Sequence, residues 1–389
     1  KTYGSFGFLS IETPAMEHIE NLLSKQGGDN EKLIFKVLKR GEKLKLEGIN
    51  DENDLVDSGL RYDLTLPLAR YYSNNLSNLP SPFKALQIGN VYRADRPQKG
   101  RFRQFTQCDI DILGEPSNLA EIELILATTK ALSRIADGKK FTVRINDRRI
   151  LSAMAMYAGY SQENINNVFI TLDKMDKIGM DGVKLELNAL DSEEKSEKYL
   201  SLFECPGTTS NEVLSLKDKL EGFIEDGVLD SLCEIIDTVL EVKTNDFSLV
   251  FDPTLVRGMG YYTGTIFEVS MEGFSGSVAG GGRYDKMIGK FTGNDTPACG
   301  FSIGFERIIA ILLDAGFKIP DESRKIAFLY EKNIDGSILK NILKEAASLR
   351  EAGNIVLVSK MNKNKKFQKE GLEKQGYVEF KEFYREALK

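Results

Sequence analysis

Residues 83–113 predict an antiparallel pair of strands, and this pair constrains the fold more than any other part of the chain. The runs FKALQIGNVYR and RFRQFTQCDIDIL have the composition of strands, and the short polar turn RADRPQKG connects them. Strands joined by so short a turn pair antiparallel, because a parallel pair needs a crossover of about a dozen residues or more. The sequence therefore predicts an antiparallel sheet.

This hairpin concentrates positive charge around its turn, in a chain whose net charge is −6. Its cations are Arg93, Arg96, Lys99, Arg101 and Arg103. Guanidinium groups match phosphate oxygens, so several of them directed at one place suit a compact polyanion. On charge alone, a solvated hairpin held by surface ion pairs is an equal alternative.

The second strand of the hairpin carries an aromatic residue followed by an alternating polar row. Phe105 can stack on a base or another ring. Gln107, Asp109 and Asp111 are two positions apart and so share one face of a strand. Their apolar neighbours predict burial of the strand, and buried polar side chains need partners that a ligand can supply.

The length of 389 residues predicts more than one domain, because a single hydrophobic core stops growing at about 250–300 residues. Short β-rich runs alternate with amphipathic helices up to about residue 150, and β-rich runs return from 247. The polar stretch between them is helical in pattern. After Pro320, KIAFLY, SILKNILKEAASLREAG and NIVLVS begin a β-α-β-α-β pattern around a mostly parallel sheet.

We therefore expect three parts. An α+β domain built on an antiparallel sheet would comprise residues 1–160 and 246–318. A helical insertion would comprise residues 161–245, and a small α/β domain residues 322–389.

The use of histidine and cysteine excludes several kinds of chemistry. The single histidine, His18, lies in PAMEHIENLLSK, which predicts an amphipathic helix, and the four cysteines share no CxxC or Cys/His spacing. We expect buried thiols, and neither a disulfide framework nor a metal site made by protein side chains.

The charge and the apolar runs also limit the location and the partners. No apolar run reaches the roughly 18 residues that span a bilayer, and the N-terminus lacks a targeting pattern. We expect a cytoplasmic protein that does not bind a membrane. The acidic balance argues against a protein that coats nucleic acid, although it leaves room for local basic sites.

The segment GLRYDLTLPLARYY places Asp63 and Thr65 two positions apart, just before a helix predicted to begin near Pro67. One interpretation makes Thr65 the N-cap of this helix and Asp63 a first-turn anion. The other makes the two residues acceptors for an ammonium group.

Glycine is dense towards the end of the expected α+β domain, where 12 of the 34 glycines fall between Gly258 and Gly304. There LVRGMGYYTGTIFEVS holds Arg257 beside Tyr261 and Tyr262, although a lone arginine in a loop is usually a surface residue. The triple glycine of SVAGGGRYDKMIGKF either lets a ligand approach backbone amides or simply forms a turn.

The segment ACGFSIGFERIIAILLDAG passes from a strand into an amphipathic helix with Arg307 in the first turn. An arginine is unfavourable at the positive end of the helix dipole, and a bound phosphate would offset it. An ion pair with Glu306 or Asp95 is the alternative. No GxxxxGK[ST] or GxGxxG follows a strand, so phosphate binding would depend on arginines.

Together these segments resemble the class II aminoacyl-tRNA synthetases, and most closely the histidyl-tRNA synthetase family. IETPAME, with Pro14, resembles the end of the first class motif; VYRADRPQKGRFRQFTQCDID resembles the second and ACGFSIGFERI the third. LRYDLT, LVRGMGYYTGTIFE and AGGGRYD are similar to stretches peculiar to the histidyl enzymes. The segments follow the order of the family over residues 8–310, and the tail resembles its anticodon-binding domain.

The resemblance implies a histidine–tRNA ligase with the class II fold. Such an enzyme activates L-histidine with ATP to histidyl-adenylate and pyrophosphate, and then transfers histidine to the 3' end of tRNA(His). It implies Mg²⁺ bound with ATP and assembly as a homodimer. The chemistry is mainly electrostatic and needs no side-chain nucleophile or base, which fits a chain with one histidine.

The resemblance also implies roles for single residues. The catalytic cations would be Arg93, Arg257 and Arg307. Histidine would contact Asp63, Thr65, Gln107, Asp111, Arg257, Tyr261 and Tyr262. ATP would contact Arg93, Asp95, Arg101, Phe105 and Arg307.

Two departures and two alternatives accompany the resemblance. Gly260 stands where the family usually has aspartate, and the C-terminal domain is short. A regulatory subunit of ATP phosphoribosyltransferase resembles the same catalytic core, but it lacks the C-terminal domain that the tail after Pro320 predicts. A class II synthetase for another amino acid is disfavoured by RGMGYYTG and by Asp111, which suits an imidazole N–H.

Overall fold

The structure is a computed structural model that describes residues 1–23, 32–49, 51–96, 102–135, 138–203, 209–256, 261–274, 276–317 and 323–385. The chain divides into two compact units, Lys1–Ala315 and Gly316–Lys389. Within the described ranges, no helix is long and apolar enough to cross a membrane.

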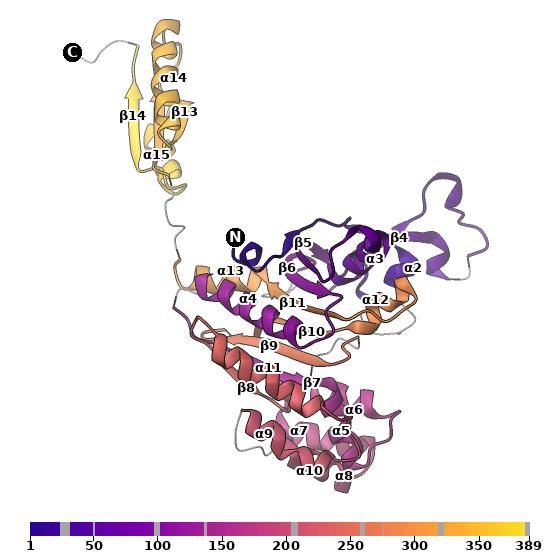
Figure 1. Cartoon of the computed structure of the whole chain (residues 1–389). Coiled ribbons are helices and arrows are strands. Elements are labelled where there is room, and N and C mark those ends of the chain that lie inside the picture. The colour runs from indigo at the N-terminus through magenta and orange to yellow at the C-terminus, as the bar shows by residue number, and fades with distance from the viewer. Residues whose placement is uncertain are drawn as a thin grey trace. The chain divides into compact units, whose positions relative to one another are not determined.

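The first unit is built on an eight-stranded sheet (Figure 1) with the order β1-β5-β6-β11-β10-β9-β7-β8. Neighbours pair antiparallel from β5 to β7, and the outer pairs β1–β5 and β7–β8 are parallel. The antiparallel sheet predicted from the hairpin is confirmed. Its strands are β1 (Leu9–Ser10), β5 (Phe83–Tyr92), β6 (Gln104–Leu113), β7 (Phe141–Asp147), β8 (Ser248–Phe251), β9 (Thr265–Met271), β10 (Ser277–Arg283) and β11 (Ala298–Gly304).

Two hydrophobic clusters cover the sheet. The larger one contains Ile110 and Ile112 of β6 together with buried residues of α4 and α11. The smaller one joins Leu68 of α3 and Ile288 of α12 to Phe83 at the start of β5. The helices of the unit outside the 148–242 region are α1 (Thr2–Ser5), α2 (Ile19–Leu22), α3 (Thr65–Asn75), α4 (Leu119–Ile135), α12 (Asp285–Thr292) and α13 (Phe305–Asp314).

The described residues between 148 and 242 form helices that gather beyond β7 and β8 (Figure 1). Their buried residues, such as Leu187 and Tyr199, belong to the same hydrophobic cluster as Ile145 of the sheet. The helical segment therefore shares its core with the sheet. Its elements are α5 (Arg148–Ala158), α6 (Ile165–Leu172), α7 (Met175–Leu190), α8 (Glu193–Leu200), the 3₁₀ turn η5 (Ser201–Phe203), α9 (Ser210–Ser215), α10 (Lys217–Leu220) and α11 (Val228–Val242).

The first unit also contains a small antiparallel sheet with the order β2-β4-β3. This sheet has its own apolar cluster, which includes Ile19 and Ile34. The helix predicted over PAMEHIENLLSK is wrong in its first half, because Met16 to His18 pair with β4 as a strand. The strands are β2 (Met16–His18), β3 (Lys36–Leu38) and β4 (Val56–Leu60), and the 3₁₀ turns are η2 (Gly41–Lys43), η3 (Glu52–Leu55) and η4 (Leu76–Asn78).

The second unit has the predicted β-α-β-α-β order and a parallel sheet, β13-β12-β14. The central strand β12 is buried on both faces, because Phe328 packs with α14 and Leu329 packs with Leu372 of α15. This is the arrangement that a continuous apolar strand such as KIAFLY favours. The elements are β12 (Lys325–Tyr330), α14 (Gly336–Glu351), β13 (Ile355–Lys360), α15 (Lys365–Glu373) and β14 (Glu379–Phe383).

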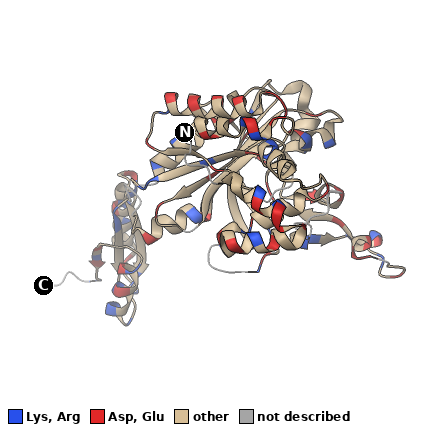
Figure 2. Ribbon diagram, turned by 90° about the horizontal axis from the view of Figure 1, so that it is seen from below, with Lys and Arg blue, Asp and Glu red and all other residues tan. Residues whose placement is uncertain are grey.

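The expectation of buried thiols is met at Cys233 and Cys299. Figure 2 shows basic and acidic residues intermingled along the helices. Cys233 and Cys299 are buried free thiols, Cys108 is half-buried, and Cys205 lies outside the described residues.

The triple glycine is not a turn, because residues 280–282 lie within β10. A Cβ on Gly281 would lie 1.9 Å from the carbonyl oxygen of Gly300 on β11 and 2.8 Å from the ring of Phe267. The strands can approach this closely only because the position has no side chain.

We predict that Gly281→Ala lowers the free energy of unfolding by more than about 2 kcal/mol, because the backbone of β11 must move to admit the methyl group. Gly4→Ala is the control, since a Cβ there meets nothing within 4 Å. Urea unfolding of both variants measures the difference. Equal stability of the two variants would contradict the packing described here.

Candidate active site

A cavity of about 420 Å³ opens over β6, β10 and β11 of the first unit. Its lining includes every predicted site residue that the structure describes, namely Asp63, Thr65, Arg93, Asp95, Phe105, Gln107, Asp111, Tyr261, Tyr262 and Arg307. Segments far apart in the sequence thus meet at one place. Two further predicted residues, Arg101 and Arg257, lie outside the described residues.

The polar row of β6 points into this cavity and retains unused acceptors. Asp109 and Asp111 are 4% and 3% exposed, and Gln107 is half-buried. In the described structure Gln107 Oε1, Asp109 Oδ1 and Asp111 Oδ2 are buried and have no hydrogen-bond partner. Buried acceptors without partners are rare in folded proteins, so a ligand with several N–H or O–H donors would suit this row.

The remaining atoms of the row are held by its neighbours. Gln107 Nε2 donates a hydrogen bond to Ser302 Oγ at 3.2 Å, and the hydroxyl of Tyr284 donates to Asp111 Oδ1 at 2.6 Å. These bonds fix which oxygen of each side chain faces the cavity. Sequence reasoning passed over both partners, although Tyr284 lies in AGGGRYD and Ser302 lies in the segment resembling the third motif.

A glycine makes the space for the Asp111 carboxylate. Gly300 lies opposite Asp111 in the β6–β11 register, and a Cβ on it would lie 2.0 Å from Asp111 Oδ1. Burial raises the pKa of Asp111 to about 7, against the hydrogen bond from Tyr284, which lowers it. The charge of Asp63 raises this pKa further. The cavity therefore concentrates carboxyl groups that a cationic ligand would favour in their ionised form.

The segment before α3 supplies another buried carboxylate. Asp63 Oδ1 accepts a hydrogen bond from the amide of Leu66 at 3.2 Å, and α3 begins at Thr65. The interpretation of Thr65 as the N-cap is therefore wrong, because Leu64 holds that position and Asp63 accepts from the free amide of Leu66. Burial raises the pKa of Asp63, while the amide of Leu66 and the charge of Arg93 lower it.

Arg93 lies between two aromatic rings at the edge of the cavity. Its guanidinium carbon is 4.1 Å from the ring centroid of Tyr62 and 4.9 Å from that of Phe105. Its Nε donates a hydrogen bond to the carbonyl oxygen of Tyr62 at 3.2 Å. Stacking on both rings holds the cation in place while it can still use its other N–H groups for an anion.

A buried arginine positions the segment that carries Asp63. Arg61 is 5% exposed, and it donates from Nε to the carbonyl oxygen of Asn90 at 2.7 Å and from Nη1 to that of Thr13 at 2.6 Å. The guanidinium passes over β5 at Gly89, where a Cβ would lie 2.6 Å from Nη2. Arg61 thus ties the segment resembling the first motif to the hairpin strand.

Arg307 lies in the first turn of α13 and lines the cavity. Its Nη1 donates hydrogen bonds to the backbone oxygen of Ser277 and, at 3.3 Å, to the hydroxyl of the same residue. The neighbouring Glu306 accepts a hydrogen bond from the amide of Thr106 at 2.6 Å. An ion pair of Arg307 with Glu306 or Asp95 stays a prediction.

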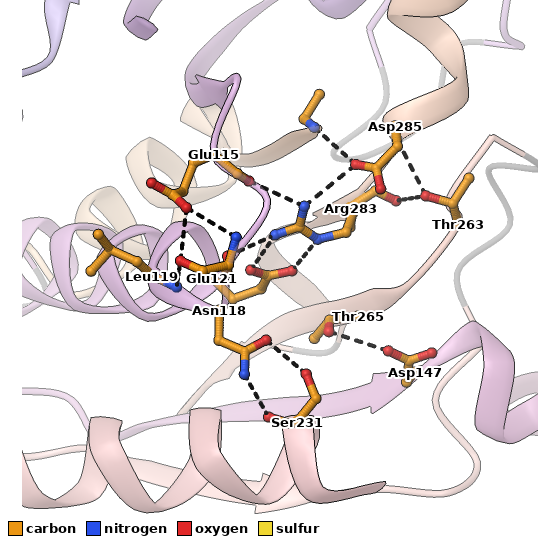
Figure 3. Close-up of polar contacts among 12 residues, drawn as sticks. Glu115, Asn118, Leu119, Glu121, Asp147, Ser231, Thr263, Thr265, Arg283 and Asp285 are labelled. Atoms are coloured by element: carbon orange, nitrogen blue, oxygen red, sulfur yellow. Dashed lines mark hydrogen bonds and ion pairs between the residues drawn. The ribbon is translucent and has the colours of Figure 1, made fainter. Parts of the chain in front are cut away.

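Arg283, at the end of β10, is held by a network of hydrogen bonds (Figure 3). Arg283 donates from Nε and Nη2 to the carboxylate of Glu121 at 2.6 and 2.7 Å, and its carbonyl oxygen accepts from the amide of Thr263 at 2.8 Å. Asp285 in turn accepts from the amide of Ala298 at 2.8 Å. This network fixes the end of β10 next to Tyr284. The sequence did not predict the pair of Arg283 and Glu121, because the two residues are 162 positions apart.

The family model described as Histidyl-tRNA synthetase matches residues 1–308. A match over this share of the chain decides the family. The chain belongs to the histidyl-tRNA synthetase family.

Known members of this family are similar to this chain over most of its length. A protein of Leifsonia xyli subsp. xyli named histidine–tRNA ligase is 41% identical over 379 residues, which cover 94% of this chain and 85% of the relative. A protein of Tropheryma whipplei named probable histidine–tRNA ligase is 39% identical over 393 residues, which cover 98% of this chain and 89% of the relative. The resemblance inferred from the motifs is confirmed.

Solved structures match the same fold. The crystal structure of histidyl-tRNA synthetase from Nostoc sp. PCC 7120 has a TM-score of 0.75 and 29% identity, and covers 96% of this chain and 83% of that one. A structure from Bacillus halodurans, titled as an ATP phosphoribosyltransferase regulatory subunit/histidyl-tRNA synthetase, also has a TM-score of 0.75 but only 20% identity. At that identity the second likeness shows the fold alone.

We predict that Arg283→Ala lowers the free energy of unfolding by about 3–5 kcal/mol, because it leaves the buried Glu121 carboxylate, 1% exposed, without its cation. The double variant Arg283→Met/Glu121→Leu should recover most of this loss. Urea unfolding measures both variants. Lys184→Ala, which breaks an exposed ion pair with Glu197, is the control and should change nothing measurable. A similar loss in the single and double variants would contradict the prediction.

Proposed function

We propose that this chain is a histidine–tRNA ligase. It would activate L-histidine with ATP, release pyrophosphate and transfer histidine from the adenylate to the 3' end of tRNA(His). Family membership supports the activity. The observation that carries the assignment to this cavity is the row of unused buried acceptors on β6, which suits an amino acid with an ammonium group and an imidazole N–H.

The amino acid would lie along β6. The α-ammonium group has three N–H donors, and Asp63, Thr65 and Gln107, which line the cavity, would offer oxygens to it. The imidazole would meet Asp111, with Tyr261 and Tyr262 beside it. Because Tyr284 already occupies Oδ1 of Asp111, the free Oδ2 is the atom available to an imidazole N–H.

The nucleotide would be held mainly by cations. Arg93 would bridge the α-phosphate and the histidine carboxylate, while Arg307 would hold the γ-phosphate. By resemblance Arg101 would reach the outer phosphates and Arg257 would add charge at the α-phosphate. Phe105 would stack on adenine, and Asp95 would complete the contacts with ATP.

Mg²⁺ would enter bound to ATP. In the described parts of the chain no three His, Cys, Asp or Glu side chains are grouped as a metal site would require. An Mg²⁺ ion that enters with ATP would take most of its ligands from phosphate oxygens and water.

Arginine charge explains how such a site lowers the barrier. The histidine carboxylate attacks the α-phosphorus and pyrophosphate leaves, so two anions must come together. Fixed guanidinium groups stabilise that charge without having to reorganise. In the second step the terminal hydroxyl of the tRNA attacks the mixed anhydride, and an adenylate phosphate oxygen can accept the proton.

The second unit would contact the anticodon arm of the tRNA. Lys363 and Lys366 are exposed at the start of α15, and Phe367 beside them is 72% exposed. Cations next to an exposed ring suit a single-stranded nucleic acid, which offers both phosphates and unstacked bases. The proposal takes residues 322–389 as this domain, with 1–160 and 246–318 as the catalytic domain and 161–245 as the insertion.

Homodimer assembly and action in the cytoplasm complete the proposal. Leu9, Met16 and Leu38 are 52%, 48% and 54% exposed near the segment resembling the first motif. Covering such side chains with a second copy of the chain would remove them from water.

We predict that the purified protein exchanges pyrophosphate into ATP only when histidine is added. Arg307→Ala should slow this exchange by about 10² or more, with histidine binding less affected, because a transition-state cation is lost. Arg134→Ala, outside the cavity lining, is the control. Absence of exchange in the wild-type protein would favour the regulatory subunit of ATP phosphoribosyltransferase over the ligase.

A separate prediction tests the second unit. The variant Lys363→Ala/Lys366→Ala should raise the KM for tRNA(His) several-fold, because each cation neutralises phosphate. Histidine-dependent pyrophosphate exchange should stay at the wild-type rate. A variant Lys332→Ala/Lys340→Ala in the same unit serves as a charge-matched control. An unchanged KM for tRNA in the first variant would contradict this use of α15.

A further inference from the structure

Asp109 is the one member of the β6 row to which the resemblance assigns no role. It is 4% exposed, it lines the cavity, and its Oδ1 has no partner in the described structure. It lies between Gln107 and Asp111 on the same face, roughly 7 Å from each along the strand. These neighbours are the residues proposed to meet the ammonium group and the imidazole.

The surroundings of Asp109 leave it available to a ligand. Opposite it on β5, Gln87 uses its amide to donate to Leu64 and to accept from Thr13. Opposite it on β11, Ser302 Oγ accepts a hydrogen bond from Gln107 and also bonds with the Asp109 carboxyl group. Oδ1 of Asp109 still has no hydrogen-bond partner among the described residues.

The charges around Asp109 oppose its ionisation in the empty protein. Burial raises its pKa well above the usual value, and the charges of Asp111 and Asp63 raise it further. The hydrogen bond of Ser302 and the charge of Arg93 lower it. A carboxyl group of this kind reduces stability at neutral pH, because the unfolded chain ionises it freely. Residues that reduce stability and remain unsatisfied are typical of functional positions.

We propose that Asp109 is a third carboxyl acceptor of the histidine site. Its Oδ1, which lies between the positions proposed for the ammonium group and the imidazole, would accept a hydrogen bond from an N–H of one of these two groups. This inference rests on the proposed function and adds a residue to it. The carboxylate would balance the positive charge that histidine brings to the cavity. It would thereby favour an amino acid that carries N–H donors at both ends.

The variant Asp109→Asn tests the proposal, since it keeps the shape and removes the charge. We expect the dissociation constant of histidine, measured by calorimetry, to rise about tenfold or more, as for the loss of a hydrogen bond to a charged group. The dissociation constant of ATP should stay within about twofold. The melting temperature should equal or exceed that of the wild type, because the neutral amide avoids the ionisation penalty.

The stability difference has a definite pH dependence. The raised folded pKa means that the folded wild-type protein binds a proton that the unfolded chain has lost above about pH 4. The stability of the wild-type protein therefore falls as the pH rises from about 4 towards the pKa of Asp109 in the folded state. An asparagine at this position does not titrate, so it adds no such pH dependence. The advantage of Asp109→Asn in melting temperature should grow between pH 5 and pH 8.

Asp147→Asn is the matched control. Asp147 is 1% exposed at the end of β7, but both of its oxygens are used, by Arg149 and by Thr265. The same change there should lower the melting temperature and leave the affinity for histidine unchanged. The two variants thus separate a ligand-binding carboxylate from a structural one.

L-Histidinol separates direct contact from an effect transmitted through Arg93. It keeps the amine and the imidazole but lacks the carboxylate that Arg93 is proposed to hold. A direct acceptor predicts the same fold-loss for histidinol as for histidine in Asp109→Asn. Normal histidinol binding would overturn the inference, and so would normal histidine binding. If wild-type protein lacks histidine-dependent exchange, the proposed function fails instead.

Discussion

The register between β6 and its two neighbours is the constraint on which the site depends. It sets Asp111 opposite Gly300 on one side and Ala85 on the other, and only small residues leave space for a buried carboxylate there. Side chains alternate along a strand, so a slip by one residue would turn Ile110 and Ile112 into the cavity and the acids into the hydrophobic cluster. The long β5–β6 hairpin makes such a slip costly, because it would unpair ten residues of matched pattern.

Around this register the protein places positive and negative groups in separate layers. Carboxyl groups occupy the floor of the cavity on β6, while Arg93 and Arg307 come from the ends of β5 and β11 at its edge. Arg93 contacts two rings and a backbone oxygen, and Arg307 donates to the backbone oxygen of Ser277. This separation would suit the proposed ligands, with a cationic amino acid beside the carboxyl groups and phosphates beside the arginines.

The sequence allowed the prediction of features that depend on local pattern. The hairpin, the buried polar row and the β-α-β-α-β tail each follow from alternation, turn residues or apolar runs within a few tens of residues. Features that depend on distant partners were missed. The strand at Met16 forms because β4 is available to pair with it, and Gly281 lies in a strand because β11 comes within contact of it. Neither neighbour is visible in the local sequence.

Tertiary partners also explain why the cap at α3 was misassigned and why the Arg283–Glu121 pair was not predicted. Thr65 and Asp63 are both good cap formers, and only the direction of the backbone decides that Asp63 takes the amide of Leu66. Glu121 looks like an ordinary helix-surface acid until the sheet buries it against Arg283.

Burial raises the pKa of Asp63, Asp109 and Asp111, so these carboxyl groups reduce the stability of the fold at a pH where the unfolded chain ionises them. A ligand that binds only the folded form adds RT ln(1 + [L]/Kd) to its stability. In this chain a cationic ligand would add its stabilisation at these three carboxyl groups. The supply of free amino acid would then set how often the polypeptide opens, and with it how long each copy survives proteases in the cell.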